Sequence, residues 1–403
     1  MAGPLSGVKV IDLTSMVSGP LATLTLADQG AVVIKVENPT GGDFSRHVAT
    51  RRGGFSASFV NNNRNKRSVI LDLKAPDGLA AFRHLAAGAD VVVQNFRPGV
   101  AARIGVGEDD LRTLNPGLIY VSICGFGFDG PYADNPVFDP LIQALSGLTT
   151  VQAGNDADRP RLVRTIIPDK LTGIQAAQAI TAALFARERT GQGQHVQLSM
   201  LDTIVAFLWN SDMGGHTFVG DEPEHERAQS FIDLIYETAD GHVSIAAMHD
   251  KHWKALAAAV ARPDFLTDPR FATPELRDIH VDDRLIITQE AVKSWPTADL
   301  LARLEAHDVP CAPVLTRREM RRHPQVAANG IVIEIDHPQA GRLRQARPPA
   351  RFSVTENEIR HAAPAYGAHT RDVLAEAGFT DAEVGALIDA GAAVQATEPE
   401  AAE

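Results

Sequence analysis

Short apolar segments alternate with helical segments through the first 124 residues, and this alternation constrains the fold more than any other feature. Strands buried on both faces are continuous apolar runs, and strands joined through helices pair in parallel. The pattern therefore predicts an α/β fold whose large domain is Rossmann-like, with a parallel sheet covered by helices on both faces. Strands are expected at residues 8–13, 32–37, 68–73, 90–94 and 118–123, with helices at 21–30 and 76–88.

The first strand-to-helix turn carries no dinucleotide fingerprint. It reads Thr14-Ser15-Met16-Val17-Ser18-Gly19-Pro20, without the Gly-x-Gly-x-x-Gly spacing. That spacing is typical of nicotinamide and flavin sites, so we expect no permanently bound cofactor. Ligands should still bind at the carboxyl ends of the parallel strands, where such sheets form a crevice.

The character of the sequence changes near residue 215. Asp240-Gly241 favours a tight hairpin turn between two short apolar runs, and helical segments punctuated by proline follow it. We expect a large domain built from residues 1–215 and 325–403, and a smaller α+β domain from residues 216–324.

Composition excludes several classes of partner. The net charge of −12 disfavours general affinity for nucleic acid or anionic membranes, which need concentrated positive charge. The two cysteines, Cys124 and Cys311, lie in no metal-ligand spacing, so no metal site is expected. No signal core and no stretch of about 18 apolar residues occurs, which indicates a cytoplasmic protein without a membrane segment.

Basic residues gather in three places despite the acidic balance. The clusters are residues 64–67, 97–103 and 317–322. Each is either a local site for an anionic ligand or a solvated surface run.

Asp169 is the leading candidate for chemistry. It stands in Ile167-Pro168-Asp169-Lys170, where a buried strand is expected to lead into a long alanine-rich helix over residues 170–189. The partial positive charge of a helix N-terminus favours an ionised carboxylate there. Such a residue is either a helix cap or a nucleophile that attacks an activated acyl group.

Several segments in fixed order resemble the class III CoA-transferase family, which includes formyl-CoA and carnitine-type CoA transferases and α-methylacyl-CoA racemases. The similarity spans nearly the whole chain, and the ordered set is specific although each segment alone is weak. The segments are Pro4–Leu13, Ser18–Pro20, Val33–Glu37, Gly41–Asp43, Asn65–Lys74, Gln94–Gly99, Asn115–Tyr120, Thr190–Gln194 and Val309–Val314.

The resemblance implies a mechanism and a set of roles. Asp169 matches the family's nucleophile, which would carry first the acyl group and then CoA, so coenzyme A and acyl-CoA are substrates. The resemblance also implies an interlocked homodimer. Residues implied to contact CoA or its thioester are Val17, Ser18, Leu71, Lys74, Asn95, Phe96, Arg97, Arg103 and Asp139.

Some of these residues could instead have only a structural role. Phe96 could be ordinary core, Lys74 a solvated strand end, and Asp139 a helix cap. Lys74, Arg97 and Arg103 offer charge to CoA, while Leu71, Asn95 and Phe96 could line a nucleotide slot.

Two other functions stay open at this point. An α-methylacyl-CoA racemase or epimerase is disfavoured because Phe138 occupies the position of the histidine that is characteristic of that branch. The other alternative is a catalytically inactive CoA-binding protein. The acyl group is not specified: Arg46, Arg51 and Arg52 could meet a dicarboxylate or be surface charge.

Overall fold

The computed structural model describes residues 3–228 and 233–396. The chain forms two compact units. The larger one comprises residues 1–226 and 330–403, and the smaller one comprises residues 227–329.

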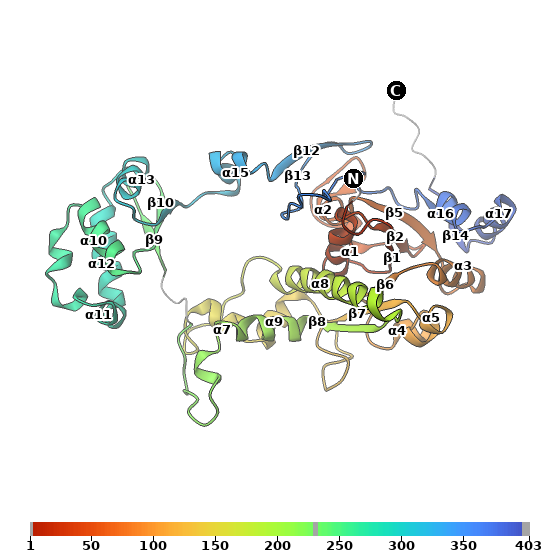
Figure 1. The fold of residues 1–403 in the computed structure, drawn as a ribbon, viewed down its shortest axis with the longest axis horizontal. Helices are drawn as coiled ribbons and strands as arrows, with labels where there is room; N and C mark the ends of the chain where they lie inside the picture. Colours follow the sequence, from red (N-terminus) through yellow and green to blue (C-terminus); the bar gives the residue numbers. More distant parts are fainter. Residues whose placement is uncertain (1–2, 229–232, 397–403) are drawn as a thin grey trace. The chain divides into compact units, whose positions relative to one another are not determined.

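The larger unit is built on a seven-stranded sheet with the order β14-β5-β2-β1-β6-β7-β8 (Figure 1). Six strands pair in parallel, and only β14 is antiparallel to its neighbour β5. The predicted α/β fold with a parallel sheet is therefore confirmed. The strands are β1 (Lys9–Asp12), β2 (Val32–Glu37), β5 (Lys66–Leu71), β6 (Val91–Gln94), β7 (Ile119–Cys124), β8 (His195–Ser199) and β14 (Ala393–Val394).

Successive residues of a strand point to opposite sides of the sheet, so apolar strands give the sheet two apolar faces. Helices cover both of these faces. Val10 packs with helices α1 (Ser18–Asp28) and α8 (Ile167–Thr190) on one face. Ile11 packs with the opposite core, formed by the helices named next. They are α3 (Pro76–Ala87), α4 (Val100–Arg103), α5 (Glu108–Leu114), α16 (Thr370–Glu376) and α17 (Asp381–Asp389).

The larger unit contains further helices and short strands. They are η1 (Phe44–His47), β3 (Arg51–Arg52), β4 (Phe55–Ser56), α2 (Ala57–Asn63), α6 (Asp139–Leu145), α7 (Leu148–Ala153), α9 (Met200–Trp209), η2 (Gly214–His216), β12 (Val332–His337) and β13 (Gly341–Ala346).

The smaller unit combines an antiparallel sheet of order β11-β10-β9 with short helices. Its core gathers around Trp253, which stacks on Phe265 at a centroid distance of 5.1 Å. Its elements are β9 (Ile235–Glu237), β10 (His242–Ile245), α10 (Asp250–Ala259), η3 (Pro263–Leu266), η4 (Pro269–Phe271), α11 (Pro274–Ile279), α12 (Val281–Val292), α13 (Thr297–Ala306), β11 (Cys311–Pro313), α14 (Arg317–Met320) and α15 (Pro324–Asn329).

The strand expected immediately before Asp169 was a wrong prediction. Residues 156–166 form turns and irregular chain, and α8 begins at Ile167 with Pro168 in its first turn. Proline suits that position because the N–H it lacks has no helical partner there. The apolar residues that suggested a strand are interrupted by arginines, and Leu162 is 48% exposed.

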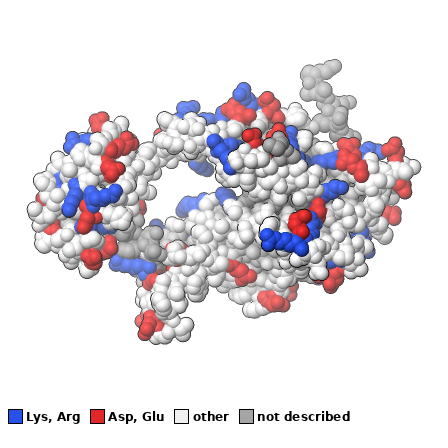
Figure 2. All heavy atoms as spheres, viewed as in Figure 1, with Lys and Arg blue, Asp and Glu red and all other residues white. Residues whose placement is uncertain are grey.

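On the face drawn in Figure 2, basic and acidic side chains both occur on the larger and the smaller unit, separated by uncharged areas. None of the described helices is long and apolar enough to cross a membrane.

Candidate active site

Asp169 lies in the first turn of α8, as its third residue. Its backbone N–H donates to Asp139 Oδ2 at 3.3 Å, and Asp139 is the first residue of α6. Asp139 is only 4% exposed, and its Oδ1 accepts from Gln143 Nε2 at 2.6 Å. The starts of α6 and α8 are thereby joined through the Asp139 carboxylate.

Gln143 is a site residue that sequence reasoning missed. Its Oε1 accepts from Val163 N–H at 2.9 Å, so it ties the chain before α8 to Asp139. The four-residue spacing between Asp139 and Gln143 on one helix was the available signal, because such pairs share a helix face.

A glycine brings α1 against α8 beside the nucleophile candidate. A Cβ on Gly173 would lie 2.7 Å from the carbonyl oxygen of Ser18. Only glycine allows this approach, which places Ser18 beside Asp169, one helical turn before Gly173. The backbone N–H and the hydroxyl group of Ser18 lie beside the Asp169 carboxylate, and both lower its pKa.

The Asp169 carboxylate is destabilised in its ionised form, which corrects the expectation from its helix position. Burial, and next the neighbouring charge of Asp139, raise the pKa of Asp169 to about 6, and the polar groups of Ser18 oppose this rise only partly. Burial also raises the pKa of Asp139. Among the described residues, Asp169 forms no ion pair with a lysine or arginine. At neutral pH Asp169 is therefore mostly ionised but more basic than an ordinary carboxylate.

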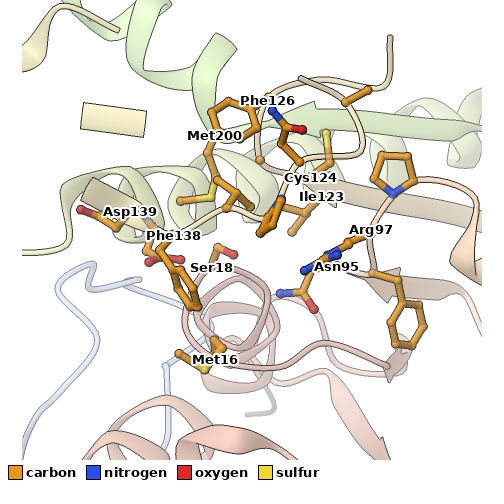
Figure 3. Close-up of a pocket in the computed structure, with 18 residues that line it drawn as sticks. Met16, Ser18, Asn95, Arg97, Ile123, Cys124, Phe126, Phe138, Asp139 and Met200 are labelled. Carbon is orange, nitrogen blue, oxygen red and sulfur yellow. Dashed lines mark hydrogen bonds between the residues drawn. The ribbon is translucent and has the colours of Figure 1, made fainter. Parts of the chain in front are cut away.

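A cavity of about 260 Å³ opens on Asp169 at the carboxyl ends of the strands. In Figure 3, Phe138 and Asp139 lie on one side of this reaction cavity and Asn95 and Arg97 on the other, with Ser18 between them. Six of the residues expected from sequence line it together: Ser18, Asn95, Phe96, Arg97, Asp139 and Asp169.

Asn95 was expected to line a nucleotide slot, but it lies at the reaction cavity and bonds to a loop there. Its Oδ1 accepts from Ser15 N–H at 2.9 Å, and its Nδ2 donates to Ser15 C=O at 2.8 Å. The side chain therefore joins the end of β6 to the loop between β1 and α1, and it lines the reaction cavity.

A second cavity of about 270 Å³ lies at the ends of β1, β2 and β5. Leu71 and Lys74 line this second cavity, and Phe96 borders both cavities. Val17 and Arg103 line neither: Val17 caps α1 and is 9% exposed, while Arg103 ends α4 in an exposed position.

Some of the basic residues are exposed and could bind a ligand, whereas others are buried in ion pairs. In the described part of the chain, Lys74, Arg97 and Arg103 are exposed and form no ion pair. Arg46, in contrast, is buried and bonded to Glu37 Oε1 and Oε2 at 2.8 and 2.6 Å. Arg46 is thus part of the fold and is not available to a dicarboxylate.

The basic cluster at residues 64–67 also differs from the expectation of a ligand site or a solvated run. Arg64 is buried against Asp28 at 2.8 Å, and Lys66 is buried against Asp12 at 3.0 Å. Among the described residues, no group of histidine, cysteine and carboxylate side chains has the arrangement of a metal site.

A comparison with protein families decides the assignment. The model of CoA-transferase family III matches residues 5–370. This chain belongs to CoA-transferase family III. The resemblance stated from the sequence is confirmed, and the enzyme transfers CoA.

Similar proteins with assigned activities extend over most of the family III chain. Succinate–glutarate CoA-transferase of Agrobacterium fabrum is 37% identical, covering 93% of this chain and 95% of the relative. Human succinyl-CoA:glutarate CoA-transferase is 31% identical, covering 96% and 89%. Formyl-CoA:oxalate CoA-transferase of Escherichia coli O157:H7 is 30% identical, covering 96% and 99%.

Solved structures agree with the fold. A CAIB/BAIF family protein from Brucella suis superposes with a TM-score of 0.82 at 32% identity, covering 94% of this chain and 100% of that one. Rv3272 from M. tuberculosis gives a TM-score of 0.80 at 32% identity, covering 92% and 98%.

Proposed function

We propose that this CoA-transferase moves CoA between short dicarboxylic acids, and that Asp169 is its nucleophile. The observation that carries the proposal is the Asp169 carboxylate, which lies in a cavity with Ser18 against it and has its pKa raised to about 6. A more basic carboxylate is a better nucleophile, and this one is still mostly ionised at neutral pH. The three similar enzymes act, by their names, on succinate, glutarate or oxalate.

The proposed reaction starts when Asp169 attacks the acyl-CoA carbonyl and the C–S bond breaks, which gives a mixed anhydride and the CoA thiolate. The thiolate then attacks the aspartyl carbonyl, forming an aspartyl-CoA thioester and releasing the donor acid as a carboxylate. An acceptor carboxylate reverses these two steps and leaves as the new acyl-CoA. No proton is gained or lost in the cycle. In this proposal, backbone N–H donors at the start of α1 would stabilise the tetrahedral oxyanions.

The proposed CoA contacts follow the two cavities. Leu71, Lys74 and Phe96 would hold the nucleotide portion in the second cavity. Arg97 and Arg103 would meet phosphates, as exposed cations without an ion pair in the described chain. In the reaction cavity, Ser18, with Val17 before it, would contact the thioester, and Asn95 and Asp139 would shape the opposite walls.

The dicarboxylate preference can be separated from general acyl transfer with one assay. Succinyl-CoA is supplied as donor with glutarate, oxalate, valerate or butyrate as acceptor, and each acyl-CoA product is quantified by chromatography. We expect transfer to a dicarboxylate and at least about tenfold lower kcat/KM for the monocarboxylate of equal length. Equal use of glutarate and valerate would contradict the substrate class, while leaving CoA transfer intact.

The same assay separates the alternatives. Asp28→Ala is the matched control, because Asp28 is a buried aspartate that pairs with Arg64 outside both cavities. It should retain transfer, whereas Asp169→Ala should lose it. Exchange of the α-proton of an α-methylacyl-CoA with solvent, without transfer, would support the racemase. Absence of both activities with CoA binding intact would support an inactive CoA-binding protein. No histidine lines the reaction cavity among the described residues, which favours transfer over proton exchange.

We also propose that the enzyme is a cytoplasmic homodimer, and that the large unit binds CoA. Apolar side chains on the outer faces of α8 and α9 are exposed, which is typical of a surface that a second copy covers. Ile174 is 57% exposed, Phe185 60% and Trp209 50%. Light scattering should give twice the mass of one chain; the mass of a single chain would contradict the dimer.

A further inference from the structure

A cluster of buried charges lies beneath the loop that joins β1 to α1. Asp12, Lys35, Asp43 and Lys66 are each at most 2% exposed, and we call them the loop cluster. Lys35 Nζ lies 2.9 Å from Asp43 Oδ2, and Lys66 Nζ lies 3.0 Å from Asp12 Oδ2. Asp43 also borders the second cavity, whereas no member of the cluster lines the reaction cavity.

The cluster bonds to the loop backbone itself. Lys35 Nζ donates to Thr14 C=O at 2.7 Å. Asp43 Oδ1 accepts from Met16 N–H at 3.0 Å, and Asp12 Oδ1 accepts from Thr14 N–H at 2.9 Å. Ser15, which lies between Thr14 and Met16, is held by the two backbone hydrogen bonds that it forms with the Asn95 side chain. Three consecutive residues are therefore held by side chains from other elements.

The loop needs this restraint because Met16 has a φ of +74°. A residue with a Cβ is strained in the left-handed region, and such a conformation persists only when surrounding contacts impose it. The reversal at Met16 leads directly into the first turn of α1. It therefore sets the direction in which Ser18 approaches Asp169.

We propose that Lys35 and Asp43 are positioning residues for CoA transfer, which act by fixing the β1–α1 loop so that Ser18 faces Asp169. The proposal rests on the proposed role of Asp169. Fold stability alone does not explain the pair, because a buried ion pair is often replaceable by apolar residues without loss of stability. The polar bonds to Thr14 and Met16 are what apolar residues cannot supply.

The test uses three single variants of the full chain. Asp43→Ala removes the acceptor for Met16 N–H, and Asp43→Asn keeps an acceptor oxygen without the charge. Asp28→Ala removes an equally buried aspartate that bonds to Arg64 away from the loop. Each variant is assayed for kcat, for KM of the acyl-CoA donor and for the Kd of free CoA, at a temperature where all three are folded.

We expect Asp43→Ala to lower kcat by roughly 10- to 100-fold, because small displacements of reacting groups have effects of this size. KM and Kd should change less than about threefold, since the loop orients groups at the reacting carbonyl. Asp43→Asn should recover most of kcat, and Asp28→Ala should leave kcat within about twofold of wild type. A kcat for Asp43→Ala equal to that of Asp28→Ala would overturn the proposal, and so would an Asp43→Asn variant as slow as Asp43→Ala.

Amide hydrogen exchange gives a readout that does not depend on activity. Exchange at residues 14–18 should accelerate at least about tenfold in Asp43→Ala and remain slow in Asp28→Ala. Unchanged exchange in Asp43→Ala would overturn the proposal even if the variant were slow. If wild type transferred no CoA, the proposed function would fail, and the exchange experiment would still decide whether Asp43 holds the loop.

Discussion

Two aspartates at the same end of the large unit, Asp12 buried and Asp169 half-buried, have opposite surroundings. Asp12, at the end of β1, has Lys66 at 3.0 Å and accepts bonds from Thr14 and Thr23. Burial raises its pKa, but Lys35, Lys66 and these hydroxyls lower the pKa of Asp12 well below its usual value. Asp169 is half-buried, the charge that acts on it is that of another carboxylate, Asp139, and its pKa rises to about 6.

The difference shows how one residue type serves two purposes. A buried carboxylate with cations and donors on every side is inert and holds the fold together. A half-buried carboxylate without a cation is kept basic and reactive, at a cost in stability. Perturbed pKa values of this second kind mark functional sites more often than structural ones. Substitutions at Asp12, at Asp169 and at its neighbour Asp139 test this difference.

The largest expected effect is the loss of transfer when Asp169 is removed. Asp169→Ala should lower kcat/KM by roughly 10⁴-fold or more, as removal of a covalent nucleophile does. The Asp28→Ala control should remain active. The measurement is steady-state transfer from the best donor, and residual activity above about 1% of wild type would assign the nucleophile elsewhere.

The second effect is a loss of stability when Asp12, the carboxylate that pairs with Lys66, is replaced. Asp12→Asn leaves Lys66 buried beside a neutral side chain, which should lower the free energy of unfolding by about 3–5 kcal/mol. Urea denaturation at pH 7 measures this change. Because the folded pKa of Asp12 is lowered, its contribution is complete above the unfolded pKa and is lost only as pH falls through the folded value. A variant as stable as wild type at pH 7 would contradict the compensating role of Lys66.

The third effect is a gain in stability when Asp169 is replaced, opposite in sign to the effect at Asp12. Its raised pKa means that the ionised form is disfavoured in the folded state, so Asp169→Asn should increase the free energy of unfolding at pH 7 by about 1–2 kcal/mol. The gain should be complete above about pH 6 and disappear as pH falls toward 3.8. Urea denaturation at pH 7.5 and pH 4 checks both parts, and a destabilised variant at pH 7.5 would show that Asp169 is compensated like Asp12.

The smallest expected effect is a shift in pH dependence at Asp139. Asp139→Asn removes the like charge beside Asp169, so the pKa of Asp169 should fall below about 6. The ratio of kcat/KM at pH 5 to that at pH 8 should then rise about threefold, because more of the nucleophile is ionised at the lower pH. An unchanged ratio, with the variant folded, would mean that burial alone sets the pKa.

The fold could be predicted well because its signals are local. The expected strand at residues 32–37 coincides with β2, and the expected helix at residues 76–88 differs from α3 by one residue. Both have the apolar pattern or the terminal proline and glycine that local rules recognise. The segment before Asp169 was misread because its apolar residues matched a strand, although neighbouring arginines keep it on the surface.

The sequence named six of the residues that line the reaction cavity, but it could not predict the electrostatics of that cavity. The family pattern named Asp169, and the helix N-terminus suggested an easily ionised group. Sequence could not show that Asp139 and burial would outweigh the helix, because both depend on which elements meet. Lys66 is the reverse case: in sequence it belongs to a basic run, yet in the fold it is buried against Asp12.

Mass spectrometry of the peptide that contains Asp169 tests the central claim most directly. The protein is mixed with succinyl-CoA, trapped with and without hydroxylamine, and digested. We predict a CoA thioester on Asp169, which hydroxylamine converts to a hydroxamate, and neither product in Asp169→Ala. Efficient CoA transfer with an unmodified Asp169 peptide, or an adduct on another residue, would contradict the assignment of Asp169 as the residue that carries the transferred group.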